Sequence, residues 1–338
     1  MKKTSFYIGI ILFIAAFASC ISDTEKKIDK PRSVGGTSEL LVVVQNQAQW
    51  NGEEGEAIRN FFEQEQYGLP QPEPIYKVTN LLVSGFSDMF KKHRNILIVE
   101  INPNLEEVTV EAYADFWAKP QHVIKIAAPN DQTWVETFNL RSQSFLDLYM
   151  AGERERMMNV YRPTINSKIT QALEKDLDIW MAVPEGFYVA KSEKDFIWIR
   201  KELIDMSQGI IAYTIPYRDT LDLTQNRLIA VRDSVLKRHI PGPLDGSYMT
   251  TDKEFMVPKI FNTGKFVTDF AVESRGMWNV VGDFMGGPFV AYTVVDQERG
   301  RLITVEGYVY APNQNKRNYL LQLESILYSL KIRTFSRK

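Results

Sequence analysis

The chain of 338 residues contains one cysteine, Cys20, and only three histidines. A single cysteine excludes both an intrachain disulfide and a cysteine-rich zinc site. An excess of charge of one sign is also lacking, because 40 Lys and Arg residues stand against 42 Asp and Glu residues. The resulting net charge of −2 argues against a protein built to coat nucleic acid. We therefore expect no nucleic-acid partner.

Sequence motifs that would identify a reaction are also missing. His93, His122 and His239 lie far apart with no HExxH spacing, so surface or element-end positions explain them better than metal binding. Asp219 and Asp222 precede a predicted helix and fit helix capping better than a calcium loop. No G-x-S-x-G, P-loop or G-x-G-x-x-G sequence is present. We therefore assign no catalytic residue and expect no metal or cofactor.

The one strongly apolar run long enough to suggest targeting begins near the N-terminus. Lys2 and Lys3 precede an apolar stretch from Phe6 to Phe17, which is shorter than the ~20 residues that span a bilayer. A basic start, a short apolar core and small residues before a break are typical of a secretory signal peptide. We predict that residues 1–19 form this peptide.

The only cysteine directly follows that segment. Phe17-Ala18-Ser19-Cys20 resembles the lipobox of bacterial lipoproteins, although Phe17 occupies a position where Leu, Val or Ile is usual. The resemblance implies that the Cys20 thiol carries diacylglycerol and becomes the new N-terminus. The alternative is a buried structural cysteine in an uncleaved anchor helix. Several acyl chains would hold the protein stably on a membrane.

The polar segment after Cys20 predicts a flexible tether over residues 20–38, because large apolar residues are nearly absent from it. Ser22-Asp23-Thr24-Glu25 has the acidic character of some surface-export signals, but an ordinary polar tether explains these residues better. We expect a protein of the cell envelope that contacts the membrane through its lipid anchor. The outer membrane is favoured over the inner one, and the periplasmic or surface face stays open.

The folded part is predicted to be α+β, with antiparallel or mixed sheets, packed helices and two closely joined halves over residues 39–160 and 161–338. Strands and helices do not alternate regularly, which disfavours a doubly wound parallel sheet. The expected strands in the first half are 40–44, 75–83, 95–101 and 121–127, with helices at 53–67 and 131–161. The expected strands in the second half are 179–183, 187–190, 196–200, 209–215, 266–273, 288–295 and 301–310, with helices at 224–239 and 316–330.

The most unusual segment runs from Glu273 to Phe289. Arg275 and Trp278 could form a recognition surface through cation and aromatic contacts. Met285-Gly286-Gly287-Pro288-Phe289 predicts a tight apolar turn that a ligand could approach. The alternative is a structural turn in which Trp278 and Phe289 pack in the core. A second cluster, Lys92-His93-Arg94-Asn95, is interpreted as a structural basic loop before a strand.

Five short strings resemble a family of Bacteroidota lipoproteins, the domain of unknown function 4837, over the whole mature chain. The strings are Trp117–Gln121, His93–Ile96, Arg275–Trp278, Met285–Phe289 and Tyr310–Asn313. The resemblance implies a lipoprotein of the cell envelope. It implies no activity, cofactor or catalytic residue.

The leading functional hypothesis is a non-enzymatic, lipid-anchored protein that binds an envelope protein or a small molecule through Arg275, Trp278 and the segment Met285–Phe289. The rival is a hydrolase of envelope polymers that uses two carboxylates as acid and base. A third hypothesis is a structural assembly factor, which would expose a broad apolar patch.

Overall fold

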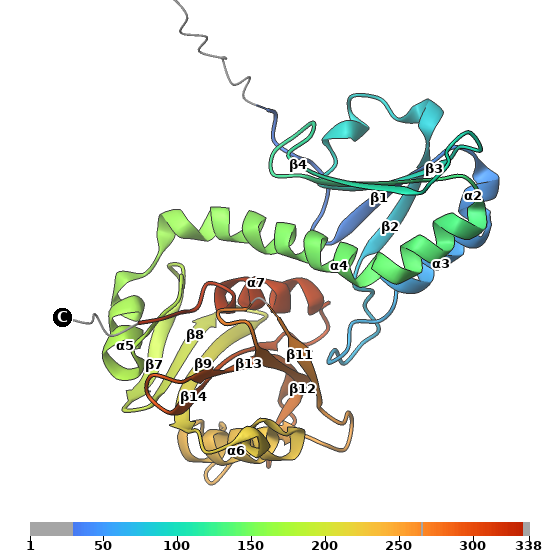
Figure 1. Cartoon of the computed structure of the whole chain (residues 1–338). Helices are drawn as coiled ribbons and strands as arrows, with labels where there is room; N and C mark the ends of the chain where they lie inside the picture. The colour runs from blue at the N-terminus through green and yellow to red at the C-terminus, as the bar shows by residue number, and fades with distance from the viewer. Residues whose placement is uncertain (1–29, 265, 334–338) are drawn as a thin grey trace, which may run out of the picture.

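A computed structural model describes residues 30–264 and 266–333. The chain folds into two α+β halves, and one long helix, α4 (Asp131–Tyr161), leads from the first half to the second (Figure 1). The predicted class of α+β with two joined halves is confirmed.

The first half is built on a mixed sheet in the order β2-β1-β3-β5-β4. Neighbouring strands are parallel except β4, which pairs antiparallel with β5 at one edge. The continuous apolar run of β1 is buried, as expected for a central parallel strand. The strands are β1 (Glu39–Val44), β2 (Lys77–Leu82), β3 (Asn95–Ile101), β4 (Thr109–Ala114) and β5 (His122–Ala128).

Helices α2 (Gln47–Asn51), α3 (Glu53–Phe62) and α4 accompany this sheet, and 3-10 turns occupy Val83–Gly85 and Phe90–Lys92. Asn130 caps α4, because its side-chain oxygen accepts a hydrogen bond from the Thr133 amide at 2.9 Å. The buried Tyr149 of α4 donates its hydroxyl to the Ile96 carbonyl at 2.7 Å. Together with the bond from the Trp134 indole N–H to the Ile126 carbonyl at 3.1 Å, this bond holds α4 against β3 and β5.

The second half contains one curled antiparallel sheet in the order β10-β12-β13-β14-β9-β8-β7, with β11 paired to β12. The strands are β7 (Tyr188–Glu193), β8 (Phe196–Glu202), β9 (Ser207–Pro216), β10 (Tyr248–Asp252), β11 (Lys259–Thr263), β12 (Ala271–Val281), β13 (Gly286–Asp296) and β14 (Arg301–Tyr310). The helices are α5 (Ser167–Leu177), α6 (Gln225–His239) and α7 (Arg317–Leu327), with 3-10 turns at Arg162–Thr164 and Thr220–Leu223. A small separate pair joins β6 (Ile179–Trp180) to β15 (Lys331–Ile332).

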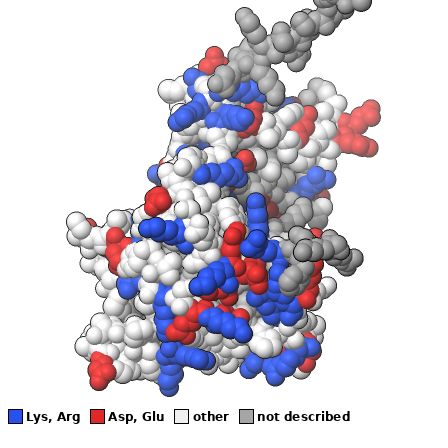
Figure 2. All heavy atoms as spheres, turned by 90° about the vertical axis from the view of Figure 1, so that its left-hand side faces the viewer, with Lys and Arg blue, Asp and Glu red and all other residues white. Residues whose placement is uncertain are grey.

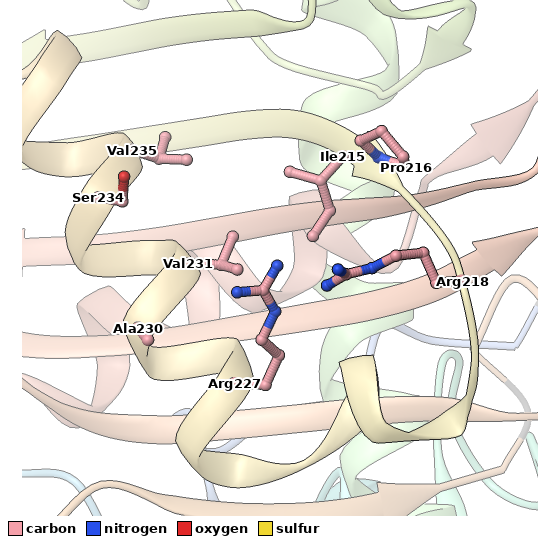
Figure 3. A pocket seen from close by; sticks show the side chains of 8 residues that line it. All are labelled: Ile215, Pro216, Arg218, Arg227, Ala230, Val231, Ser234 and Val235. Atoms are coloured by element: carbon pink, nitrogen blue, oxygen red, sulfur yellow. The ribbon is translucent and has the colours of Figure 1, made fainter.

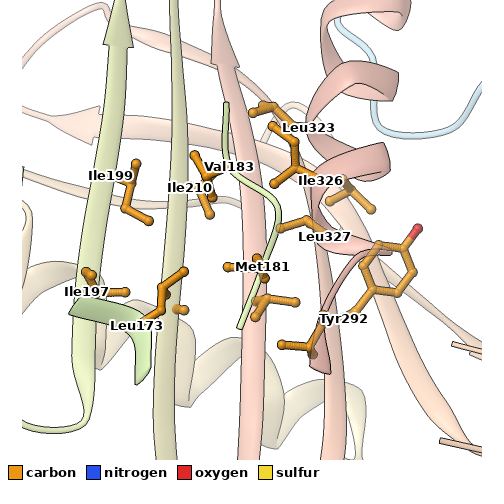
Figure 4. Packing of buried hydrophobic residues seen from close by; sticks show 14 of the residues in the cluster. Leu173, Met181, Val183, Ile197, Ile199, Ile210, Tyr292, Leu323, Ile326 and Leu327 are labelled. Carbon is orange, nitrogen blue, oxygen red and sulfur yellow. The ribbon is translucent and has the colours of Figure 1, made fainter. Parts of the chain in front are cut away.

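Helices cover both faces of this sheet. One face packs against α5 and α7 through a core that includes Leu173, Ile199, Ile210 and Leu323 (Figure 4). The opposite face packs against α6, where a second core includes Leu236. Both faces are therefore filled by side chains from the chain itself.

A loop of the first half reaches into the second. Leu69, which follows α3, belongs to the core formed with α5 and α7. The buried carboxylate of Glu73 accepts the amide N–H groups of Lys316 at 2.6 Å and of Arg317 at 3.1 Å, at the start of α7. The loop thus supplies both an apolar anchor and a cap for a helix of the other half.

Several element predictions are confirmed within a few residues, and two are wrong in an informative way. The predicted helix 53–67 ends at Phe62, because the next residues form a bridged loop in which Glu65 pairs with Pro74. The predicted strand 266–273 begins only at Ala271, since Thr263 pairs with Ala271 and the residues between them connect β11 to β12. Strand β4 was not predicted, because its mostly exposed residues carry little apolar pattern.

Part of the predicted tether is bound to the first half. Arg32 bridges to Lys119, and Val34 bridges to His93. The amide of Val34 donates to the Lys92 carbonyl at 2.9 Å, and the Arg94 amide donates to the Val34 carbonyl at 3.0 Å. Within the described residues, the chain is therefore held against the fold before β1 begins.

Candidate functional site

The seven residues of the predicted binding surface lie on one β-hairpin, β12–β13. Trp278 pairs with Gly287 and Gly276 pairs with Phe289 in the antiparallel register. Met285 lies in the connecting loop and Pro288 in β13, opposite Met277. The sequence analysis thus identified residues that the fold brings together.

Arg275 is part of an ionic cluster and does not form an open recognition surface. Its guanidinium contacts the carboxylate of Glu273 and donates from Nη2 to Glu324 Oε2 at 2.7 Å. Burial lowers the pKa of Arg275, but the two carboxylates outweigh burial and hold that pKa well above its ordinary value. Because two carboxylates inside the fold already pair with its guanidinium, Arg275 has a structural role.

Trp278 and Phe289 are also buried and belong to the core beneath α6. The indole N–H of Trp278 donates to the Val309 carbonyl at 3.3 Å. Arg232 of α6 lies 3.7 Å from the centre of the Phe289 ring and forms a bidentate pair with Glu306, at 2.6 and 2.7 Å. For these two aromatic residues, the structural alternative of the sequence analysis describes their environment.

The glycines allow strands to approach closely. A Cβ atom at Gly287 would lie 2.0 Å from the Val309 carbonyl oxygen, and one at Gly286 would lie 2.9 Å from the Trp278 carbonyl oxygen. Buried Pro288 lies between them and Phe289. The Gly-Gly pair therefore serves strand packing.

The accessible part of the hairpin lines a shallow groove of about 310 Å³. Phe284, at the hairpin tip, is fully exposed, and Phe255 of the loop after β10 is 64% exposed. Pro70, in the loop after α3 of the first half, lines one side of the groove. The groove is lined by Pro70, Asp252, Phe255, Met277, Trp278, Asn279, Asp283, Phe284, Met285 and Gly286. We call this set the junction groove.

The two halves are fastened together beside this groove. The Tyr67 hydroxyl donates to the Val257 carbonyl, and the Lys259 ammonium lies 4.1 Å from the centre of the Tyr67 ring. Val257 itself is 62% exposed. Exposed apolar surface therefore lies next to the contact that joins the two halves.

Of the predicted surface, the junction groove contains Trp278, Met285 and Gly286. Sequence reasoning missed Phe284, Phe255 and Pro70. Phe284 lay inside the unusual segment, and its position between Asp283 and the Gly-Gly pair was the signal available for an exposed turn residue. Nothing in the local sequence joined Pro70 to this site, because only the tertiary fold brings them together.

The three histidines considered as metal ligands each make contacts within the fold. His93 donates from Nδ1 to the Asn95 carbonyl at 3.0 Å, and the His122 amide donates to the Arg94 carbonyl at 2.9 Å. His239 stacks on Phe196 with ring centres 4.1 Å apart. Burial lowers the pKa of each histidine. Within residues 30–264 and 266–333, no group of three or more His, Cys, Asp or Glu side chains is arranged to hold a metal ion.

Asp219 and Asp222 differ in role. The Asp219 carboxylate caps the 3-10 turn by accepting the Leu221 amide at 2.8 Å. Asp222 is buried and contacts Arg218 and Arg227. Thr224 precedes α6 as predicted, but its hydroxyl donates to the Leu221 carbonyl. Capping therefore describes Asp219, whereas Asp222 serves an ion pair.

Carboxyl groups of the kind that a hydrolase would need occur in two places. In the junction groove, Asp252 and Asp283 each accept amide N–H groups of their own loops, so they stabilise turns. At the carboxyl ends of β1 and β5, the nearly buried Glu54 lies near Asp131. Burial, and then the neighbouring Asp131, raise the pKa of Glu54.

Cys20, the predicted signal peptide and the first part of the predicted tether lie outside the described residues. None of the helices in the described part of the chain combines the length and apolar character needed to cross a bilayer. On the face shown in Figure 2, Lys and Arg side chains are interspersed with Asp and Glu over the lower part of the molecule.

Fold and site together define an α+β protein with a junction groove between its halves. Residues 165–329 match the domain of unknown function DUF4837, and residues 33–162 match the domain of unknown function DUF8532. The predicted match to the domain of unknown function 4837 is confirmed over residues 165–329. Its predicted extent over the whole mature chain is wrong, because residues 33–162 match a different domain.

Comparison with curated proteins gives no match. Among solved structures, LpqN of Mycobacterium tuberculosis, described as involved in cell envelope biogenesis, aligns with a TM-score of 0.27 at 13% identity. That alignment covers 46% of this chain and 83% of LpqN. The human StarD13 (DLC2) lipid transfer and protein localization domain aligns with a TM-score of 0.21 at 11% identity, covering 51% of this chain and 99% of that domain. Both likenesses are distant.

Proposed function

We propose that this chain is a lipid-anchored protein of the cell envelope that binds another envelope protein at the junction groove. The observation that carries the proposal is Phe284, a fully exposed aromatic ring on the rim of that groove. Large apolar side chains that cluster in a surface depression are typical of binding sites, whereas isolated ones are not. Phe255 and Met285 supply the cluster.

The framework behind the groove supports binding without large rearrangement. Trp278 is buried and hydrogen-bonded, and the nearby Tyr67 to Val257 bond ties the two halves together. A rigid site loses less conformational entropy when a partner binds. The groove is therefore suited to a partner that inserts an apolar side chain beside Phe284.

Anchoring is supported by the lipobox-like sequence before Cys20. The Cys20→Ala variant should keep its signal segment and should not incorporate labelled palmitate, whereas the wild-type chain should lose the segment and incorporate the label. Incorporation of palmitate into Cys20→Ala would contradict the assignment. Fractionation of the two membranes then tests the outer-membrane placement.

Partner binding is tested by affinity purification from membranes of the native host. We expect Phe284→Asp to lose a co-purifying protein that wild type retains. Leu140→Asp is the matched control, because Leu140 is 84% exposed on α4 and lies outside the groove. An unchanged set of partners for Phe284→Asp would contradict the proposal.

A second candidate, a hydrolase of envelope polymers, is favoured only by the pair Glu54 and Asp131. A buried carboxyl group with a raised pKa suits a general acid, and the carboxyl ends of parallel strands are where α/β proteins bind ligands. Glu54→Gln should then abolish release of fragments from purified envelope polymers. Equal release, or none from wild type, would exclude this candidate.

A further inference from the structure

A second depression, unrelated to the junction groove, lies between α6 and the end of β9 (Figure 3). Its volume is about 470 Å³, within the range of ~300–1,000 Å³ common for small-molecule sites. It is lined by Ile215, Pro216, Arg218, Arg227, Ala230, Val231, Ser234 and Val235. We call it the α6 groove.

The long wall of the α6 groove is apolar. Val231 and Val235 are four residues apart and therefore lie on the same face of α6, one turn from each other. Ile215 of β9 lies opposite them (Figure 3). All three are partly exposed and rest on the core beneath α6. This wall offers an unbranched chain an apolar surface that runs along about one turn of α6.

One end of the α6 groove is lined by two guanidinium groups, those of Arg218 and Arg227. Arg218 contacts Asp222 through Nη2 at 2.8 Å and through Nε at 3.4 Å. Arg227 contacts the same carboxylate through Nε at 3.3 Å. The Asp219 carboxylate, which caps the Leu221 amide, also attracts the Arg218 guanidinium, but it is not part of the groove lining. Two guanidinium groups therefore share the single buried carboxylate of Asp222.

The geometry of Arg227 leaves donors for a ligand. Among the described residues, the Nε contact to Asp222 is the only hydrogen bond of this side chain. Its two terminal nitrogens point toward the space between Val231 and Arg218 (Figure 3). A guanidinium fork of this kind binds a carboxylate in a bidentate manner.

We propose that the α6 groove binds a free single-chain fatty acid. The carboxylate of the ligand lies at Arg227 and Arg218, and its alkyl chain lies along Val231, Val235 and Ile215. Charge at one end and an apolar wall along the rest match an anion that carries an unbranched hydrocarbon chain. A purely apolar ligand would leave the arginine end unused, and a compact anion would leave the apolar wall exposed.

Calorimetric titration of the full-length folded chain with decanoate tests this proposal, with 1-decanol as the uncharged comparison. We expect saturable binding of decanoate to wild type. Arg227→Gln should weaken decanoate binding at least about tenfold, because it removes a charged hydrogen-bonding partner, and should leave decanol binding unchanged. Val231→Asp should abolish binding of both.

Arg238→Gln is the matched control, since Arg238 is an exposed arginine in the last turn of the same helix. It should change decanoate binding less than about twofold, because exposed charges outside a site contribute little. Thermal melts of each variant check folding, and Arg227→Lys, which keeps the charge without the fork, serves as a second probe. We expect Arg227→Lys to bind between wild type and Arg227→Gln.

Three results would overturn the proposal. They are no saturable binding of decanoate to wild type, equal weakening by Arg227→Gln and Arg238→Gln, and tighter binding of decyl phosphate than of decanoate. Phe284→Asp should bind decanoate as wild type does. The proposals for the junction groove and for the α6 groove can therefore be contradicted independently of each other.

Discussion

Arg275 on β12 and Glu324 on α7 form an ion pair of 2.7 Å across the face of the second sheet. The other oxygen of Glu324 accepts a bond from Arg154 of α4 at 3.3 Å. Burial raises the pKa of Glu324, but Arg275 and Arg154 outweigh burial and hold that pKa below its usual value. Because α4 arrives from the first half, this cluster joins the two halves through charge.

Removing Arg275 should leave the buried carboxylate of Glu324 with Arg154 as its remaining ionic partner and should break the contact to Glu273. Arg275→Ala is expected to lower the free energy of unfolding by about 3–5 kcal/mol, as is typical for a broken buried pair. Urea denaturation measures this loss. The control Arg141→Ala, at an exposed position of α4, should change stability by less than about 0.5 kcal/mol. A similar small effect of Arg275→Ala would contradict the account of this cluster.

The two phenylalanines at the ends of the hairpin segment should behave in opposite ways. Phe289 is fully buried, so Phe289→Ala should cost about 3–5 kcal/mol of stability. Phe284 is fully exposed, so Phe284→Ala should change stability by no more than about 0.5 kcal/mol. Thermal and urea unfolding of both variants checks the contrast. Comparable losses in the two variants would place Phe284 in a packed environment and remove the basis for the junction groove.

Gly287 should be intolerant of even one methyl group. The added Cβ would lie 2.0 Å from the Val309 carbonyl oxygen, so β13 and β14 would have to separate. We expect Gly287→Ala to lower the melting temperature strongly or to prevent folding. Gly264→Ala is the control, because its nearest neighbour would be an Asp269 oxygen at 3.8 Å. A normal melting temperature for Gly287→Ala would show that the strands are not held this closely.

Asp222 makes the stability of the fold depend on pH. The hydrogen bond from Arg218, opposed by burial, lowers the pKa of Asp222 from 3.8 to about 2. Because the native pKa is lower than the unfolded one, the ionised carboxylate stabilises the fold above about pH 4. This contribution is lost as the pH falls toward 2.

The stability difference between wild type and Asp222→Asn should therefore be largest near pH 5 to 7 and shrink below pH 4. Urea denaturation at several pH values measures it. Asp245→Asn, at an exposed loop position, is the control and should show no such trend. A difference that stays constant down to pH 2 would show that Asp222 has no ionic role in the fold.

The long elements were predicted well. The strand from Asn95 to Ile101 follows from a run of apolar residues, and the helix from Asp131 to Tyr161 follows from the absence of proline and from large apolar residues spread along it. The edge strand β4 carries little such signal, because most of its side chains are exposed. The loop after α3 could not be interpreted locally, since Leu69 is buried in the other half of the molecule.

The candidate sites, like the elements of the fold, were predicted only in part. The predicted tight turn over Met285–Phe289 is wrong, because Gly286 already begins β13 and the connecting loop precedes it. The sequence also did not distinguish buried Trp278 from exposed Phe284. Trp278 lies on β12 beneath α6, whereas Phe284 lies in the loop that joins β12 to β13, and only the fold shows this difference. Arg218 and Arg227 were not identified either, because their shared partner Asp222 and the apolar wall of α6 meet only in the folded chain.

Site-specific photo-crosslinking in intact cells of the native host tests the central claim most directly. A photoreactive phenylalanine analogue replaces Phe284 in one variant and Leu140 in another, and both positions are exposed. The account predicts a discrete crosslinked protein from position 284 that is absent from position 140 and that disappears when Phe255→Asp is added. Equal crosslinking at the two positions, or none at position 284, would contradict a partner site at the junction groove.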